Sequence, residues 1–386
     1  MSNKFYSGKV ITISISHFFH DVYSAFLAPM IPLLISKYGI SLSMVGLLDV
    51  IRKVPTFFNP FIGLLADKIC LRYLVIFTPA LTAASMSLLG LSPTLGVLLI
   101  LLFVSGLSSA LFHIPAPILV KQYSGSKIAR GMGFYMFGGE MARTIGPLVI
   151  TAALSFWGLE GTYKLMPIGL LASAILFFKL KDISSIERKK TVEGKKSIKQ
   201  DIKEFIPFLI FVIGFHLFRS GMKSALTLYL PTYIVGNGDT LWLAGISLSV
   251  LQLSGSIGTV VIGYISEKLS IRKTLIIVTA LCPVIMIMFI MANDFFIIPL
   301  LVVLGFLLFA TGPIMLTLVQ SIETERPAFL NSIYMAVNFG VSSLMVFVVG
   351  ILGDSLGLAL TFKICAVLAF LAVPFIYLLP KNQSEI

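Results

Sequence analysis

The stretch Gly63-Leu-Leu-Ala-Asp67-Lys68-Ile-Cys-Leu-Arg72 returns, 200 residues later, as Gly263-Tyr-Ile-Ser-Glu267-Lys268-Leu-Ser-Ile-Arg272. Both copies keep a glycine, a carboxylate four residues on, a lysine directly after it and an arginine four residues beyond. The glycine lets a neighbouring helix approach closely, and the charged groups suit a tight loop held by charge-assisted hydrogen bonds. Two unrelated basic turns at a membrane surface are the alternative, but the equal spacing favours a duplicated loop.

The composition on either side of these loops is that of a polytopic helical membrane protein. Of 386 residues, 57% are hydrophobic and 12% are charged, about half the charge of a soluble protein. The apolar residues form blocks of about 20 or more, the length of a membrane-spanning helix. The alternating ten-residue strands of a membrane β-barrel are missing from the sequence. The first block contains His17, His20 and Asp21, so it is a poor match to a cleaved signal peptide.

The apolar blocks predict an all-α membrane protein with twelve transmembrane helices in two pseudo-symmetric six-helix bundles around a central cavity. The predicted spans are 8–36, 43–66, 73–92, 95–121, 130–156, 162–180, 204–234, 241–267, 273–292, 295–320, 328–353 and 357–379. The third, sixth, ninth and twelfth spans are nearly all apolar and should face lipid or support the bundles.

The net charge of +12 lies mainly in alternate loops, where it indicates membrane orientation rather than binding of nucleic acid. Basic loops stay in the cytoplasm, so we expect both termini there. The most basic segment, 181–203, is the one long polar stretch and is predicted to be a cytoplasmic linker. It separates an N-terminal bundle, 1–180, from a C-terminal bundle, 204–386.

The two halves repeat each other at further positions, with offsets of 199 or 200 residues. The matching pairs are Ser24-Ala25 with Ser224-Ala225, Tyr135-Met136 with Tyr334-Met335, and Gly158-Leu159 with Gly357-Leu358. Parallel half-repeats imply a pseudo-two-fold axis along the membrane normal and a binding site between the halves.

Twelve spans, a basic central loop and the duplicated loop motif together resemble the major facilitator superfamily. The stretches around His17-Phe-Phe-His20-Asp21, Gly106–His113 and Gly138–Pro147, with Arg219-Ser220, resemble its fosmidomycin-resistance group of proton-driven exporters. The resemblance implies alternating access, and Gly146-Pro147 matches the core of a motif associated with antiporters. We expect the loop motifs and this pair to gate the transporter, through Gly63, Asp67, Lys68, Arg72, Gly146, Pro147, Gly263, Glu267, Lys268 and Arg272.

Polar and charged side chains recur at helical spacing along several predicted spans, where a charge is costly and usually marks a pathway. We expect a proton-coupling set of His17, His20, Asp21, Asp49 and Glu140. We expect a substrate-binding set of Arg52, Lys53, His113, Arg143, His216, Arg219, Lys223, Gln252, Tyr334 and Asn338.

Each cluster has alternative interpretations. Asp49 with Arg52 or Lys53, and Glu140 with Arg143, have the spacing of ion pairs that only hold helices together. The histidines and aspartate of the first span suit a proton relay, because imidazole titrates near neutral pH. They could also ligate a metal, with His113 as a further ligand, or serve in helix packing. We favour the relay and predict no metal.

The predicted function is secondary active transport, in the mode of proton-coupled export of a small anionic or zwitterionic organic solute. Five intramembrane cations against three carboxylates favour such a solute, since arginine binds carboxylate and phosphonate groups through paired donors. Uptake by symport and a non-transporting membrane sensor are the alternatives. No nucleotide-binding loop, metal-binding cysteine set or nucleophile triad is visible, so no enzyme is expected.

We further expect the proton gradient as the energy source without any cofactor, and partners limited to the solute, protons and the bilayer. The expected state is a monomer in the inner (plasma) membrane.

Overall fold

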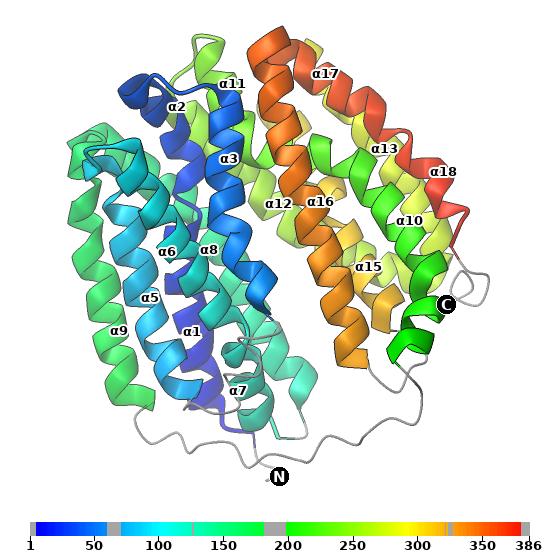
Figure 1. The fold of residues 1–386 in the computed structure, drawn as a ribbon, viewed down its shortest axis with the longest axis horizontal. Coiled ribbons are helices and arrows are strands. Elements are labelled where there is room, and N and C mark those ends of the chain that lie inside the picture. The colour runs from blue at the N-terminus through cyan, green and yellow to red at the C-terminus, as the bar shows by residue number, and fades with distance from the viewer. Residues whose placement is uncertain are drawn as a thin grey trace. The chain divides into compact units, whose positions relative to one another are not determined.

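A computed structural model describes residues 5–59, 71–125, 127–180, 198–320, 322 and 327–379, and within these ranges every regular element is a helix. It divides into two compact units (Figure 1). Unit 1 comprises Met1–Ile40, Leu48–Arg188 and Ile234–Ser249, and unit 2 comprises Ser41–Leu47, Lys189–Tyr233 and Val250–Ile386. Each unit thus includes a short segment from the other half of the sequence. The boundaries 1–180, 181–203 and 204–386 stay a prediction.

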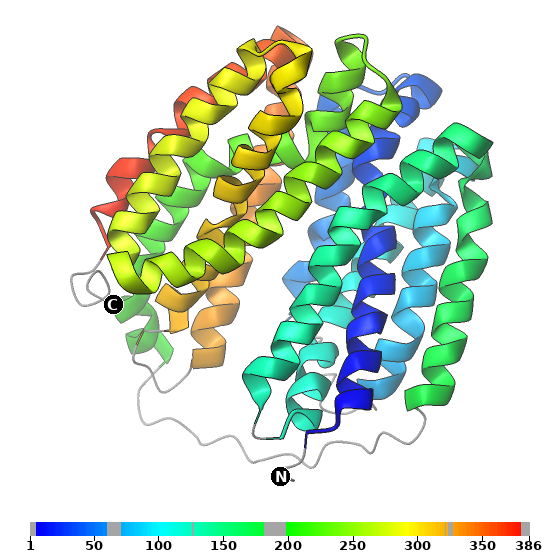
Figure 2. The ribbon, with the colours of Figure 1, turned by 180° about the vertical axis from the view of Figure 1, so that it is seen from behind.

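Unit 1 is built around α1, which packs against α8, α5, α9 and α7. Figure 2 shows α1, in dark blue, running alongside the long helix α8. Apolar side chains from these helices and from α6 form a buried cluster that includes Val10, Ile13, Phe112, Leu119 and Tyr135. The bounds are α1 Ser7–Ser24, α2 Leu27–Tyr38, α3 Leu42–Lys53, α5 Leu71–Ser87, α6 Leu95–His113, α7 Pro115–Tyr123, α8 Ile128–Trp157 and α9 Met166–Leu180, with 3-10 turns η1 Val54–Phe58, η2 Leu89–Leu91 and η3 Glu160–Leu165.

Unit 2 is built around α10, which packs against α16, α17 and α18. A second group of contacts joins α13 to α14, α17 and α18. The bounds are α10 Ile198–Ser224, π-helical turn η4 Ala225–Tyr229, α11 Leu230–Gly236, α12 Leu241–Leu269, α13 Ile271–Met291, α14 Asp294–Phe309, α15 Thr311–Gln320, α16 Pro327–Leu356, α17 Leu358–Ala369 and α18 Ala372–Ile376.

Nine helical stretches in the described part of the chain are long and apolar enough to cross a membrane. The longest are Ser7–Tyr38, which joins α1 and α2, and Phe205–Gly236, which joins α10 to α11. The chain is therefore a multi-pass helical membrane protein. The predicted total of twelve spans stays a prediction, since parts of the chain lie outside the described residues.

The internal repeat predicted from the sequence has a counterpart in the helix boundaries. Helices α8 and α16 both contain 30 residues and begin 199 residues apart. Each is followed by a glycine with a positive φ, Gly158 at 71° and Gly357 at 76°, a conformation in which other residues are strained. Helices α1 and α10 both end at a serine, Ser24 and Ser224. Helices α8 and α16 thus begin and end at equivalent residues, and α1 and α10 end at equivalent residues.

Candidate functional site

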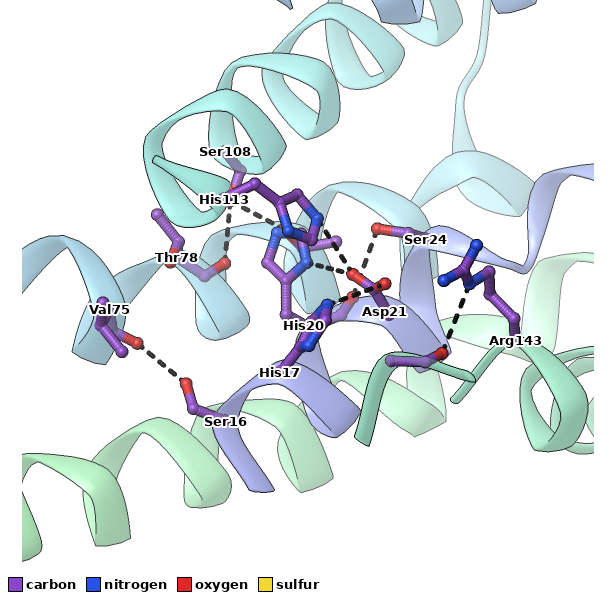
Figure 3. Close-up of polar contacts among 12 residues, drawn as sticks. Ser16, His17, His20, Asp21, Ser24, Val75, Thr78, Ser108, His113 and Arg143 are labelled. Carbon is purple, nitrogen blue, oxygen red and sulfur yellow. Dashed lines mark hydrogen bonds and ion pairs between the residues drawn. The ribbon is translucent and has the colours of Figure 1, made fainter. Parts of the chain in front are cut away.

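Three imidazoles converge on Asp21, near the middle of the stretch formed by α1 and α2 (Figure 3). His17 Nε2 lies 3.2 Å from Asp21 Oδ2. His20 Nδ1 donates a hydrogen bond of 2.9 Å to Asp21 Oδ1. His113, at the end of α6, places Nε2 3.3 Å from the same Oδ1. His17, His20 and Asp21 are buried, whereas the side chain of His113 is 38% exposed. The structure thus joins three residues of the predicted proton-coupling set with one of the predicted substrate-binding set.

Tyr135 on α8 orients two of these imidazoles, and the residue is not among those predicted from the sequence. Its carbonyl oxygen accepts a 2.8 Å hydrogen bond from His17 Nδ1, and its hydroxyl lies 3.3 Å from His113 Nδ1. Its ring also stacks on His17, with centroids 4.0 Å apart. The one signal in the sequence was the repeat of Tyr135-Met136 at Tyr334-Met335.

Glycines on α8 allow this close approach to α1. A Cβ at Gly139 would overlap the ring of His17, and a Cβ at Gly146 would lie 2.7 Å from both the Ala25 Cβ and the Val22 carbonyl oxygen. Gly146 was predicted to take part in gating with Pro147, which lies inside α8. In the structure Gly146 sets the separation of two helices.

A second charged cluster lies on α3. Asp49, which is buried, is 3.1 Å from Arg52 Nη2 and 2.6 Å from Lys53 Nζ. Arg52 Nη1 also donates a 2.8 Å hydrogen bond to the carbonyl oxygen of Ser24, the last residue of α1. The carboxylate neutralises one cation, so the three side chains keep one net positive charge (−1 + 1 + 1). Both cations are partly exposed, Arg52 by 23% and Lys53 by 26%.

The third charged group of unit 1 is an ion pair on α8. Arg143 Nη2 lies 2.5 Å from Glu140 Oε1, and Arg143 Nε donates a weak hydrogen bond to the carbonyl oxygen of Gly139 at 3.4 Å. Both side chains are partly exposed. The pairing predicted from the i, i+3 spacing is therefore present, and Glu140 and Arg143 remain within reach of a solute.

The predicted residues of unit 2 form a different arrangement. Arg219 is buried, and its Nη2 donates to the carbonyl oxygens of Leu308 at 2.6 Å and Leu307 at 3.4 Å, in the last turn of α14. Lys223 Nζ lies over the ring of Phe309, 5.5 Å from its centroid. The last carbonyls of a helix lack intrahelical donors, so a guanidinium is a suitable cap for them.

His216 and Tyr334 lie near each other, with ring centroids 6.1 Å apart. They are the equivalents of His17 and Tyr135 at an offset of 199 residues. Gln252 on α12 and Asn338 on α16 are half-buried.

Most of the predicted gating residues lie outside the described part of the chain. Gly63, Asp67 and Lys68 lie outside the described residues, as do the side chains of Glu267 and Lys268 and the surroundings of Gly263. Arg72 Nη2 donates to the hydroxyl of Tyr73 at 3.0 Å, and Arg272 Nη2 donates to the carbonyl oxygen of Leu379 at 2.8 Å.

An unpredicted contact in unit 2 involves Asp354, near the end of α16. Its two carboxylate oxygens accept hydrogen bonds from the backbone N–H groups of Leu42 at 2.6 Å and Ser43 at 2.8 Å. These amides belong to the first two residues of α3 and therefore have no hydrogen-bond partner within that helix. No side-chain pattern signals this contact, because its donors belong to the backbone.

Comparison with known proteins agrees with this architecture. The chain is 22% identical to the fosmidomycin resistance protein of Escherichia coli (strain K12), over 97% of this chain and 93% of that protein. It is similar in fold to a bacterial homolog of the human lysosomal transporter Spinster, in an inward-facing and unoccupied conformation, with a TM-score of 0.80, 14% identity and coverage of 99% of this chain and 98% of the other. It is also similar to a D-xylose–proton symporter, with a TM-score of 0.76, 12% identity and coverage of 99% and 100%. Residues 13–339 match the Major Facilitator Superfamily, and the chain belongs to this family of membrane transporters.

Proposed function

We propose that the chain exports a small organic solute carrying an anionic group, by alternating access and in exchange for protons. The family supports transport of a small molecule across a membrane. The Escherichia coli relative is a resistance protein, which supports export. We further propose that the chain works as a monomer in the cell membrane with both termini in the cytoplasm, and that the proton gradient drives it without a cofactor.

The observation that carries the anionic solute is the charge of the α3 cluster. Arg52 and Lys53 share one carboxylate, Asp49, and both remain partly exposed on a helix that is predicted to be part of a membrane span. An uncompensated cation there is costly unless it has a function. A carboxylate or phosphonate of the solute would supply the missing negative charge, and a guanidinium binds such groups through two parallel hydrogen bonds.

The ion pair of Glu140 with Arg143 offers a way to couple solute and protons. A zwitterionic solute could replace Arg143 at the carboxylate of Glu140 with its own positive group. Protons and solute would then compete for Glu140, which is the requirement for exchange. We therefore favour a solute that carries both charges.

Uptake by symport is the second candidate, and the same ion pair favours it if the solute is a simple anion. Such an anion would replace Glu140 at Arg143 and leave the carboxylate without this cation. Loss of a nearby cation favours the protonated form of a carboxylate. Solute and proton would then bind together rather than compete.

The two candidates predict opposite effects of proton binding on the affinity for the solute: protonation weakens solute binding in exchange and strengthens it in symport. We would first screen carboxylates, phosphonates, zwitterions and fosmidomycin for thermal stabilisation of the purified protein, since a ligand at 100 times its Kd adds about 2.7 kcal/mol. The affinity of the best compound is then measured against pH. Affinity that rises as pH rises supports exchange, and affinity that falls supports symport.

Transport in proteoliposomes tests the role of Glu140. Glu140→Gln should keep solute counterflow but lose the dependence of net flux on a pH gradient. The matched control is Glu160→Gln, since Glu160 pairs with Lys37 at 3.3 Å on an exposed turn, and it should transport like the wild type. Full gradient dependence in Glu140→Gln would remove Glu140 from the coupling, and no flux of any compound would favour a non-transporting sensor.

A further inference from the structure

We propose that His17, Asp21 and His113 bind one divalent transition-metal ion, with Zn²⁺ as the best-fitting class. The inference concerns binding alone and does not rest on the proposed transport of an anion. It departs from the expectation of a proton relay without metal, because the structure adds contacts that the sequence pattern could not show.

The separations of the ligand atoms fit a tetrahedral ion. His17 Nε2 and Asp21 Oδ2 are 3.2 Å apart, and His113 Nε2 and Asp21 Oδ1 are 3.3 Å apart. One ligand atom from each of the three residues lies within 4.8 Å of the others. Ligand atoms at 2.0–2.1 Å from Zn²⁺ in a tetrahedron are about 3.3 Å from one another. The two short separations end on different oxygens of Asp21, so binding through one oxygen requires the longest separation, at most 4.8 Å, to shorten by up to about 1.5 Å.

In its neutral form His17 has a lone pair on Nε2, whereas a proton on that nitrogen would complete an ion pair with Asp21. Its Nδ1 faces the carbonyl oxygen of Tyr135 at 2.8 Å and must carry a proton, because a carbonyl only accepts. Nε2 is buried and has no hydrogen-bond partner among the described residues, although Asp21 Oδ2 is 3.2 Å away. In the neutral imidazole this nitrogen and the carboxylate are two acceptors facing each other. A cation between them resolves that conflict.

Hydrogen-bonding groups lie next to the second ring nitrogen of each histidine and next to the carboxylate of Asp21, as they do around metal ligands. The Tyr135 hydroxyl lies 3.3 Å from His113 Nδ1, so one tyrosine holds the distal nitrogens of both histidines. His20 donates to Asp21 Oδ1 and orients the carboxylate. Outer partners of this kind fix the tautomer and the ring orientation of ligating histidines.

The donor set selects the ion. Two imidazoles and a carboxylate suit Zn²⁺, Co²⁺, Fe²⁺ or Ni²⁺ rather than Mg²⁺ or Ca²⁺, which prefer oxygen ligands alone. Three protein ligands leave a fourth tetrahedral position open, as in zinc sites that also bind water or a substrate oxygen. His113 is the partly exposed member of the set, so the open position would be reached from its side.

The experiment uses the full-length protein, purified without a polyhistidine tag and stripped of metal with a chelator. Co²⁺ is titrated in and followed by its visible absorption, and Zn²⁺ is then added in competition. We expect one Co²⁺ per chain, a spectrum of tetrahedral cobalt and its loss on addition of Zn²⁺. His113→Ala should weaken binding by more than about 100-fold, and Tyr135→Phe, which keeps the carbonyl but loses the hydroxyl, by about 10-fold.

The matched control is His216→Ala, which should bind Co²⁺ like the wild type. His216 lies near the position of His17 in the repeat, but the residues that match Asp21 at offsets of 199 and 200 are Ser220 and Gly221, and neither offers a carboxylate. The melting temperature of each variant shows whether it is folded, and the exposure of His113 makes its replacement the least disruptive. Absence of stoichiometric Co²⁺ in the wild type, or equal affinity in folded His113→Ala, would overturn the site and leave a proton as its occupant. Metal binding without transport, or transport without metal binding, separates this inference from the proposed function.

Discussion

At the residue scale, Arg219 illustrates how a buried cation can bind backbone carbonyl groups instead of a carboxylate. The sequence predicts a solute contact, because Arg219 has no acidic neighbour on its own helix. In the structure it is 5% exposed, and its guanidinium caps the end of α14 through the carbonyls of Leu307 and Leu308. A role in stability follows from these contacts, and the predicted role in solute binding stays a prediction.

Replacement of Arg219 separates these two roles. Arg219→Ala should lower the free energy of unfolding by about 1.5–3 kcal/mol, the contribution of hydrogen bonds from a charged group. Lys363→Ala, at an exposed position on α17, should change it by less than about 0.5 kcal/mol. Chemical unfolding in detergent measures both. An Arg219→Ala variant as stable as the wild type, but with weaker binding of an anionic compound, would assign the residue to the solute instead.

At the element scale, the contact between α1 and α8 positions the whole histidine cluster. α1 carries His17, His20 and Asp21, while α8 carries Tyr135 and the glycines that let the two helices meet. Small residues at such interfaces allow close backbone approach, which is a common basis of helix association in membranes. The geometry of the cluster therefore depends on glycines that lie outside it.

Gly146→Ala tests this dependence. The added methyl would lie 2.7 Å from the Val22 carbonyl oxygen and the Ala25 Cβ, so we expect a loss of about 1–3 kcal/mol from overpacking. Gly133→Ala on the same helix is the control, because a Cβ there has no neighbour within 4 Å. Its higher helix propensity should make it neutral or more stable by up to about 1 kcal/mol. Equal melting temperatures for the two variants would contradict a close α1–α8 contact at Gly146.

At the scale of the whole molecule, a duplicated sequence carries two different sites. The pair His17 and Tyr135 has its equivalent in His216 and Tyr334, and α8 has its equivalent in α16. At offsets of 199 or 200 residues, however, the second half has Ser220 or Gly221 in place of Asp21, and Gly312 or Pro313 in place of His113. The two halves thus share equivalent helices, but the combination of Asp21 and His113 is present in the first half alone.

The orientation of the molecule in the membrane is testable with single cysteines in a Cys70→Ser background, where Cys282 and Cys365 are buried. Ser2→Cys and Ser384→Cys should react with a membrane-impermeant thiol reagent only after the cytoplasmic face is opened, because basic loops stay in the cytoplasm. Asn237→Cys, in the exposed turn between α11 and α12, should react from outside in intact cells. Labelling of a terminus from outside would contradict the predicted topology.

The sequence by itself determined the class of the protein and much of its helical framework. Long apolar blocks can only be satisfied in a membrane as helices, because every backbone polar group needs a partner there. The repeat offsets placed equivalent ends, as at Gly158 and Gly357, because a positive φ restricts the residue type. Helical spacing also placed Glu140 and Arg143 in an ion pair, since i and i+3 are neighbours on one helix.

Only the tertiary structure decided what meets across helices. Helical periodicity gives the face on which Asp21 lies but not the helix opposite, so the sequence named His113, 92 residues later, only as one possible further ligand. The role of Tyr135 could not be derived. Contacts to backbone atoms could not be predicted from the sequence either. Backbone carbonyl and amide groups occur along the whole chain, so residue types do not indicate which of them a side chain will contact. Arg219 on the carbonyls of α14 and Asp354 on the amides of α3 are such contacts. Helix packing brings these groups together, and it depends on the shapes of whole surfaces rather than on the spacing of residues along one helix.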